Sequence, residues 1–177
     1  GLGGDCFVLL KPAGEERIVA LNGSGRAPQG LSAAEMRAKG LSSVPTHGPE
    51  AVTVPGAVDA FCRLSAEWGA LPLAQVLAPA IRYAEDGVPV APRTARDWAE
   101  AAGDLKGAAR DFFLLHGKAP EVGQVFRAPG QAEVLRRIAA NGRAGFYEGE
   151  VAEDMVTSLR ALGGTHTLDD FAATACT

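Results

Sequence analysis

The chain has 177 residues, within the range of one domain, and 47% of them are hydrophobic against 21% charged, as in ordinary globular proteins. The net charge of −4 comes without any basic block, which argues against nucleic acid or an anionic membrane surface as a partner. No apolar run approaches the roughly 20 residues that a membrane-spanning helix needs.

Cysteines and histidines do not form a recognisable metal or disulfide framework. The cysteines are odd in number and lack CxxC spacing, which predicts buried or incidental thiols: Cys6, Cys62 and Cys176. The histidines stand in predicted loops without the i, i+4 spacing of a metal-binding helix: His47, His116 and His166. We predict no metal and no cofactor, and a solvated loop position for His47.

The first 30 residues predict a β-hairpin followed by a loop. Residues 6–10 are a continuous apolar run of strand length, residues 11–16 have turn chemistry, and residues 17–21 predict a second strand. A continuous apolar strand needs cover on both faces, which two strands alone cannot provide. We therefore expect the hairpin to belong to a larger sheet.

Two glycine-rich segments flank these strands. Residues 1–5, Gly-Leu-Gly-Gly-Asp, precede a strand instead of following one, so they lack the context of a nucleotide-binding loop, and close backbone packing is the better interpretation. Residues 22–28, Asn-Gly-Ser-Gly-Arg-Ala-Pro, leave the second strand as a polar loop, a common place for ligand contacts.

The rest of the chain predicts helices. A capping box at Ser32 starts a short helix that ends at Gly40, residues 41–55 predict a loop, and a helix from Pro55 ends at Gly69. Apolar spacing continues over residues 73–87, but Pro79 should kink or break this segment and open its second piece. Further helices are expected over residues 92–102, 108–115 and 131–141.

Residues 142–152 predict a corner between two amphipathic helices. Phe146 and Tyr147 fall in its tight turn and should pack into the junction, and residues 151–162 carry the next apolar helix face. A second capping box at residues 167–170 starts a helix that we expect to be cut off by the end of the chain at Thr177. Together with the start at Gly1, this predicts a part of a longer protein that lacks its true N-terminus. The absence of a signal peptide therefore decides nothing about the compartment, which is periplasmic or secreted, or cytoplasmic.

Composition and pattern alone indicate a mostly helical α+β unit with no catalytic signature. The order of several motifs is more specific than any one of them, and over essentially all 177 residues it resembles the large-subunit part of the γ-glutamyltranspeptidase (glutathione hydrolase) family. The motifs are Gly-Leu-Gly-Gly-Asp (1–5), Asn-Gly-Ser-Gly-Arg-Ala-Pro (22–28), Thr-Val-Pro-Gly (53–56), Ala-Pro-Ala-Ile (78–81), Ala-Glu-Asp-Gly (84–87), Ile-Ala-Ala-Asn-Gly (138–142), Phe-Tyr-Glu-Gly-Glu-Val-Ala (146–152), Leu-Gly-Gly (162–164) and Leu-Asp-Asp-Phe (168–171).

The resemblance implies an incomplete piece of the αββα fold of N-terminal nucleophile hydrolases, with sheet strands and a substrate loop in residues 1–30 and a mainly helical part in residues 31–177. In that family the precursor cleaves itself, and the threonine exposed at the start of the small subunit attacks the γ-glutamyl amide, its free α-amine acting as base. The resemblance therefore places no catalytic residue in this chain, makes it inactive alone, and names the small subunit of the same precursor as its partner.

One residue of the family's substrate site falls inside the chain. The classical enzymes hold the substrate α-carboxylate with an arginine in the loop after the second strand, and the resemblance puts that position at Ser24. A serine hydroxyl cannot replace the bidentate contact of a guanidinium, although Arg26 lies two residues away and is a second candidate for substrate binding. The motif resembles the γ-glutamyltranspeptidase-like and cephalosporin-acylase-like branch, which leaves both a γ-glutamyl amide, such as glutathione, and another acyl amide as substrate. The alternatives are a non-enzymatic relative used for binding or assembly, and an unrelated helical interaction module.

Overall fold

The computed structural model describes residues 1–177, which fold into two compact units. One unit comprises residues 1–76 and 136–177, and the other comprises residues 77–135. Helices α3 (Leu73–Asp86) and α6 (Pro129–Asn141) run across the two boundaries between them. The sequence predicted a different kind of division, into sheet strands and substrate loop (residues 1–30) and a mainly helical part (residues 31–177). That division stays a prediction.

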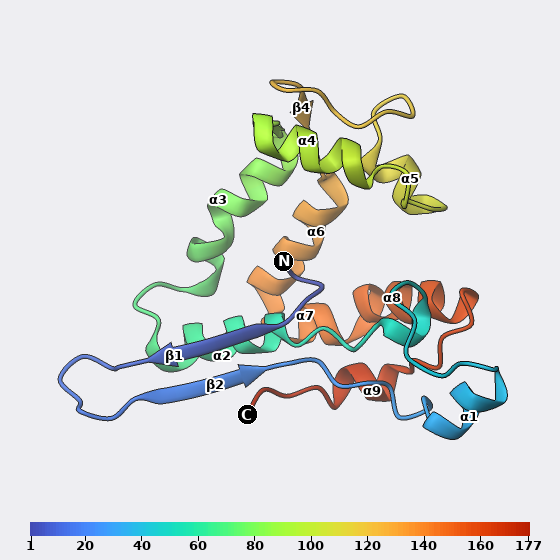
Figure 1. Cartoon of the computed structure of the whole chain (residues 1–177). Coiled ribbons are helices and arrows are strands. Elements are labelled where there is room, and N and C mark those ends of the chain that lie inside the picture. Colours follow the sequence, from blue (N-terminus) through green and yellow to red (C-terminus); the bar gives the residue numbers. More distant parts are fainter. The chain divides into compact units, whose positions relative to one another are not determined.

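The first unit is built on an antiparallel hairpin. β1 (Cys6–Leu10) pairs with β2 (Val19–Gly23) so that Phe7 lies opposite Asn22, which confirms the predicted hairpin, with the second strand starting two residues later than expected. The unit also contains α1 (Ala33–Ala38), η1 (Pro49–Ala51), α2 (Ala57–Trp68), α7 (Ala144–Tyr147), α8 (Gly149–Ala161) and α9 (Leu168–Ala172) (Figure 1).

One face of the hairpin packs on α2 and the other is open. Leu21 and Ala60 are buried at the contact, with Cys6, Val8 and Leu64 packed around them. On the opposite face the exposed fractions of Phe7 and Leu9 are 68% and 80%. A strand pair with such a face needs a further layer, as the apolar run in the sequence predicts.

The second unit is small and mostly helical. It contains α4 (Pro92–Ala101) and α5 (Ala108–Phe113), and β3 (Val88–Pro89) pairs with β4 (Val125–Phe126).

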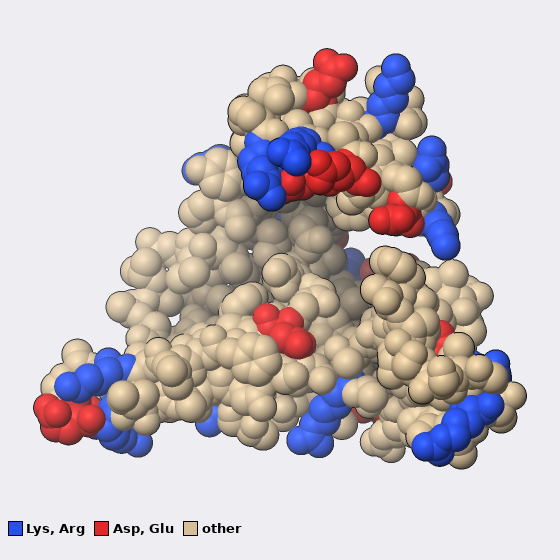
Figure 2. Space-filling view, in the orientation of Figure 1, with Lys and Arg blue, Asp and Glu red and all other residues tan.

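Figure 2 shows acidic and basic side chains interspersed on the visible face, without a broad region of one sign. No helix of either unit has the length and apolar character required to cross a bilayer.

Two predictions about helices were wrong. Pro79 does not break the segment or open a second piece but lies inside the single helix α3, and the predicted kink stays a prediction. Pro79 has no N–H for the carbonyl of Gln75, and that carbonyl belongs to an exposed residue where water can reach it. The helix predicted to be cut off near Thr177 instead ends at Ala172, with Ala173 as its C-cap. Both predicted capping boxes, at Ser32 and Thr167, are present.

The corner at residues 142–152 contains a short helix, α7, where a tight turn was expected. Phe146 and Tyr147 are buried there, as predicted. The Tyr147 hydroxyl donates to the Pro55 carbonyl (2.7 Å) and accepts from the Asp59 backbone N–H (3.1 Å). It thereby caps α2, whose N-cap residue Gly56 has no side chain to do so. Burial raises the pKa of Tyr147 to about 12, so the hydroxyl stays protonated and remains a donor.

Removing this hydroxyl should destabilise the first unit. Tyr147→Phe leaves the Pro55 carbonyl and the Asp59 N–H buried without their partner, a loss of about 1–3 kcal/mol. The measurement is thermal and denaturant unfolding of the whole protein. Tyr83→Phe, at a position 57% exposed in the second unit, is the matched control and should be near neutral. Equal stability of the two variants would contradict the capping role.

Candidate functional site

The polar loop after β2, residues 22–28, holds both predicted substrate-binding residues. Its backbone is fixed at successive positions: the Ser24 N–H donates to the Asn22 side-chain oxygen (3.0 Å), and the Gly25 N–H donates to Asp5 Oδ1 (2.8 Å). The Arg26 carbonyl accepts from the Val54 N–H (2.9 Å). Two flanking side chains and one neighbouring segment thus define the path of the loop.

Two glycines let this loop lie directly on the segment before α2. A Cβ atom on Gly25 would sit 2.2 Å from the Val54 carbonyl oxygen, and one on Gly56 would sit 2.3 Å from that of Gly23. At Gly25 and at Gly56 the backbone of the loop therefore contacts the backbone of the segment before α2, and no side chain would fit between them. This contact is the physical reason why the motifs at residues 22–28 and 53–56 occur together.

The side chains of Ser24 and Arg26 are both exposed. The Arg26 guanidinium makes no ion pair with another side chain, so its five N–H donors are open to a ligand from solvent. Both residues thus lie in one fixed loop, and their role in substrate binding stays a prediction.

The exit of the loop is held by α9. Asp170 Oδ1 accepts from the Gln29 N–H (2.9 Å), while Oδ2 accepts from the Thr167 backbone N–H (2.9 Å) and hydroxyl (2.7 Å). Burial opposes ionisation of Asp170, but these hydrogen bonds outweigh it and hold its pKa below the ordinary value.

A second charged group lies in the first turn of α2. Asp59, 8% exposed, accepts from Arg143 Nε through Oδ1 (2.8 Å) and from the Cys176 backbone N–H through Oδ2 (2.7 Å). Burial alone would raise the pKa of Asp59, but the hydrogen bonds from Cys176 and Arg143 outweigh it, so the pKa lies below its ordinary value. Arg143 also lies over the Tyr147 ring, with Cζ 4.9 Å from the ring centre.

The last residues of the chain reach the edge of the hairpin. Thr177 and Asn22 exchange two backbone hydrogen bonds, of 2.7 and 3.0 Å, the pattern of paired antiparallel residues (Figure 1). Ala20 faces the same edge two residues earlier on β2. A shallow hollow of about 680 Å³ lies here, lined by Phe7, Val8, Leu9, Ala20, Leu21, Asn22 and Thr177.

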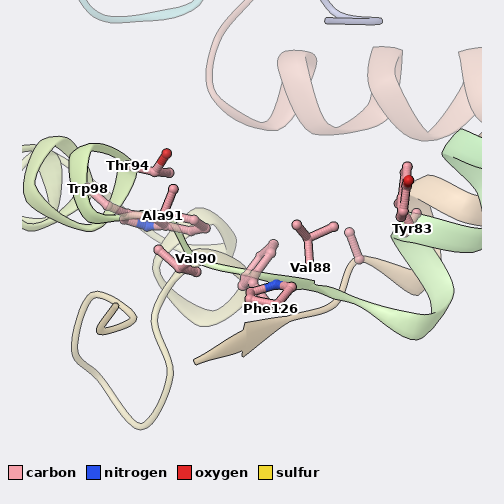
Figure 3. A pocket seen from close by; sticks show the side chains of 10 residues that line it. Tyr83, Val88, Val90, Ala91, Thr94, Trp98 and Phe126 are labelled. Carbon is pink, nitrogen blue, oxygen red and sulfur yellow. The ribbon is translucent and has the colours of Figure 1, made fainter. Parts of the chain in front are cut away.

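The other cavity worth considering lies in the second unit and lacks catalytic groups. It has a volume of about 350 Å³ and is lined by small apolar residues, Tyr83, Thr94 and the aromatic pair Trp98 and Phe126 (Figure 3). The rings of this pair are 4.8 Å apart, edge to face. No carboxylate, imidazole or thiol lines it, and the phenol of Tyr83 is its one titratable group.

The three histidines are not gathered into a site. His166 is fully buried, and its Nε2 lies 2.8 Å from the Val52 carbonyl oxygen, a packing role that its position in a predicted loop did not indicate. His47 is exposed in the loop, as predicted. No group of three metal-ligating side chains occurs in the chain.

A family model described as gamma-glutamyltranspeptidase matches residues 1–175. The chain belongs to this family. It is 39% identical over 176 residues to the glutathione hydrolase-like YwrD proenzyme of Bacillus subtilis, covering 98% of this chain and 33% of the relative. It is also 39% identical over 182 residues to the oxamate amidohydrolase proenzyme of Klebsiella pneumoniae, covering 98% and 34%.

The fold agrees with this membership. The crystal structure of cephalosporin acylase from Bacillus halodurans superposes with a TM-score of 0.94 at 40% identity, over 100% of this chain and 34% of that one. The predicted fold class is confirmed: a mainly helical piece of the N-terminal nucleophile hydrolase fold with an N-terminal hairpin. The chain spans about a third of the length of these γ-glutamyltranspeptidase-family relatives.

Acid should weaken the fold through Asp59 and Asp170. Because each folded-state pKa is depressed, the stabilisation is fully present above the unfolded pKa of about 3.9 and is lost as pH falls through the lower folded values. We expect Asp59→Asn to flatten the fall in unfolding free energy below about pH 4.

The measurement is denaturant unfolding of the whole protein at a series of pH values. The control is Asp97→Asn, which removes an exposed i, i+4 partner of Arg93 and should keep the wild-type slope. An Asp59→Asn curve parallel to the wild type throughout this range would contradict the assignment.

Proposed function

We propose that the whole protein is an amide hydrolase or acyltransferase of the N-terminal nucleophile class, and that this chain supplies its substrate-carboxylate side. The observation that carries the proposal is the 22–28 loop: a fixed backbone at the end of a sheet strand, with Ser24 and an unpaired Arg26 open to solvent. The family's carboxylate-binding position falls within this loop.

The nucleophile comes from polypeptide outside this chain. A threonine at a newly formed N-terminus attacks the amide carbonyl, its α-amine takes the hydroxyl proton, and an acyl-enzyme forms as the protonated amine departs. Water then hydrolyses the ester, or a second amine accepts the acyl group. Residues 1–177 by themselves should be inactive.

The same polypeptide is the proposed partner of the hairpin. The hairpin face that carries Phe7 and Leu9 is not covered by another layer. The edge of β2 is paired with Thr177 at Asn22 and has room for a further strand beyond it. The small subunit of the same precursor would bury both and bring its threonine to the same side of the sheet as the loop.

The substrate is an acyl amide that carries a carboxylate. The names of the relatives cover a glutathione hydrolase-like protein, an oxamate amidohydrolase and a cephalosporin acylase, so the reaction is common to them while the acyl group differs. Ser24 stands where the classical γ-glutamyl site has its arginine, so the guanidinium that this loop offers to a substrate carboxylate is that of Arg26.

The test is an assay of the full-length mature protein on matched anilides. A γ-glutamyl, a glutaryl and an uncharged butyryl anilide separate the α-amino acid group, the bare carboxylate and the apolar acyl chain. We expect turnover of at least one carboxylate-bearing anilide and little of the butyryl one. No turnover of any anilide, with no free N-terminal threonine, would support a non-enzymatic binding relative instead.

Arg26→Ala should raise KM for the carboxylate-bearing substrate about tenfold to a hundredfold, because it removes a charge-assisted hydrogen bond. Arg37→Ala, an exposed arginine on α1, is the matched control and should leave kinetics unchanged. An equal effect on the butyryl anilide would show that Arg26 does not bind the carboxylate.

Ser24→Arg should move specificity in the opposite direction. A guanidinium at this position adds a bidentate contact for the substrate carboxylate, so the ratio of kcat/KM for the γ-glutamyl over the uncharged butyryl anilide should rise about tenfold or more. Ser43→Arg, in the polar loop before η1, adds the same charge elsewhere in the first unit and is the control. An unchanged ratio would show that the substrate carboxylate does not lie within reach of position 24.

A further inference from the structure

The chain between α9 and the hairpin edge is held almost entirely through its backbone. Arg143 donates from one terminal nitrogen to the Ala172 carbonyl (3.2 Å) and to the Thr174 carbonyl. Asp59 accepts from the Cys176 N–H (2.7 Å), and Arg63 donates to the Cys176 carbonyl (3.2 Å). Three charged side chains therefore fix a segment that has no regular structure of its own.

The end of that segment meets the residue that shapes the candidate site. Thr177 exchanges two backbone hydrogen bonds with Asn22, and the Asn22 side-chain oxygen accepts from the Ser24 N–H (3.0 Å). Each step from Asp59 to Ser24 is thus either a hydrogen bond or one peptide unit. All of these residues belong to the first unit.

We propose that Asp59 and Arg143 are positioning residues for substrate binding: they hold residues 172–177 so that Thr177 keeps Asn22, and through it the Ser24 loop, in the binding geometry. This inference rests on the proposed function of the loop. Neither residue touches substrate in this scheme: Asp59 is buried in the first turn of α2, and its carboxylate is occupied by Arg143 and Cys176.

The hydrogen bonds of Asp59 and Arg143 need a carboxylate with two acceptor oxygens and a forked guanidinium. The two carboxylate oxygens of Asp59 accept from two different chain segments, whereas in asparagine one of these two atoms is an NH2 group that would face an N–H donor. Arg143 uses Nε for Asp59 and a terminal nitrogen for the two carbonyls, and the compact lysine ammonium cannot reproduce that fork. Asp59→Asn and Arg143→Lys therefore loosen residues 172–177 with minimal change in volume.

The first measurement is amide hydrogen exchange in the full-length mature protein. In Asp59→Asn we expect the amides of Asn22 and Ser24 to exchange about tenfold faster or more, because both hydrogen bonds depend on the held segment. Amides of α4, in the second unit, should keep their rates. Acceleration everywhere, or nowhere in the 22–28 loop, would overturn the proposal and leave Asp59 a residue of general stability.

The second measurement is the kinetics of the same variants on the carboxylate-bearing anilide. We expect KM to rise about three- to tenfold in Asp59→Asn and in Arg143→Lys, with kcat within about twofold, since the loop binds and does not react. Asp97→Asn and Arg93→Lys make the same chemical changes in an exposed pair and should keep the wild-type KM. Should Asp59→Asn fail to fold, Asn22→Ala tests the last step alone and should raise KM similarly.

The outcomes separate this inference from the function on which it rests. If the wild-type protein hydrolyses none of the anilides, the proposed function fails. If it is active and Arg26→Ala raises KM while Asp59→Asn and Arg143→Lys do not, the function stands and the positioning role is wrong.

Discussion

The carboxylate of Asp59 ties together parts of the chain that no local interaction would join. One oxygen accepts from Arg143 in the corner before α7, and the other accepts from the backbone of Cys176 near the end of the chain. A buried ion pair returns little net stability once both charges are desolvated, so its main effect is on geometry. Here it fixes where residues 172–177 run, and with them the outer edge of β2.

The candidate site depends on that edge and on a close approach of two backbones. The 22–28 loop lies on residues 53–56 with glycines at the contact, and Asp5 and Asn22 hold its N–H groups from either side. Exposed loops that carry binding residues are useful only if their backbone is defined. The conformation of this loop is set by hydrogen bonds from within the first unit, while its side chains remain free for a ligand.

Local signals in the sequence predicted most of the elements. The apolar run of β1, the capping boxes at Ser32 and Thr167 and the glycine stop after α2 each involve neighbours a few residues apart, and each is present in the structure. Pro79 was misjudged because helix propensity says nothing of whether the freed carbonyl can reach water. The burial of His166 was not predicted, because burial of a loop residue is decided by the segments that pack over it.

The interactions that shape the site could not be predicted in the same way. Asp59 and Arg143 are 84 positions apart, and Asp59 and Cys176 are 117 apart, with no periodicity or motif to link them. Asp59 stood on a predicted helix beside the apolar positions, where a carboxylate is ordinarily a solvated residue. Only the family resemblance drew attention to Ser24 and Arg26, and it identified the loop without identifying what holds it.

The central claim is that this chain forms one side of a site whose nucleophile is a threonine created by cleavage of a longer precursor. Intact mass and N-terminal sequencing of the full-length gene product after maturation test it most directly. We expect two chains, the smaller one beginning with a threonine that has a free α-amine. An active amidase that remains a single uncleaved polypeptide would contradict it.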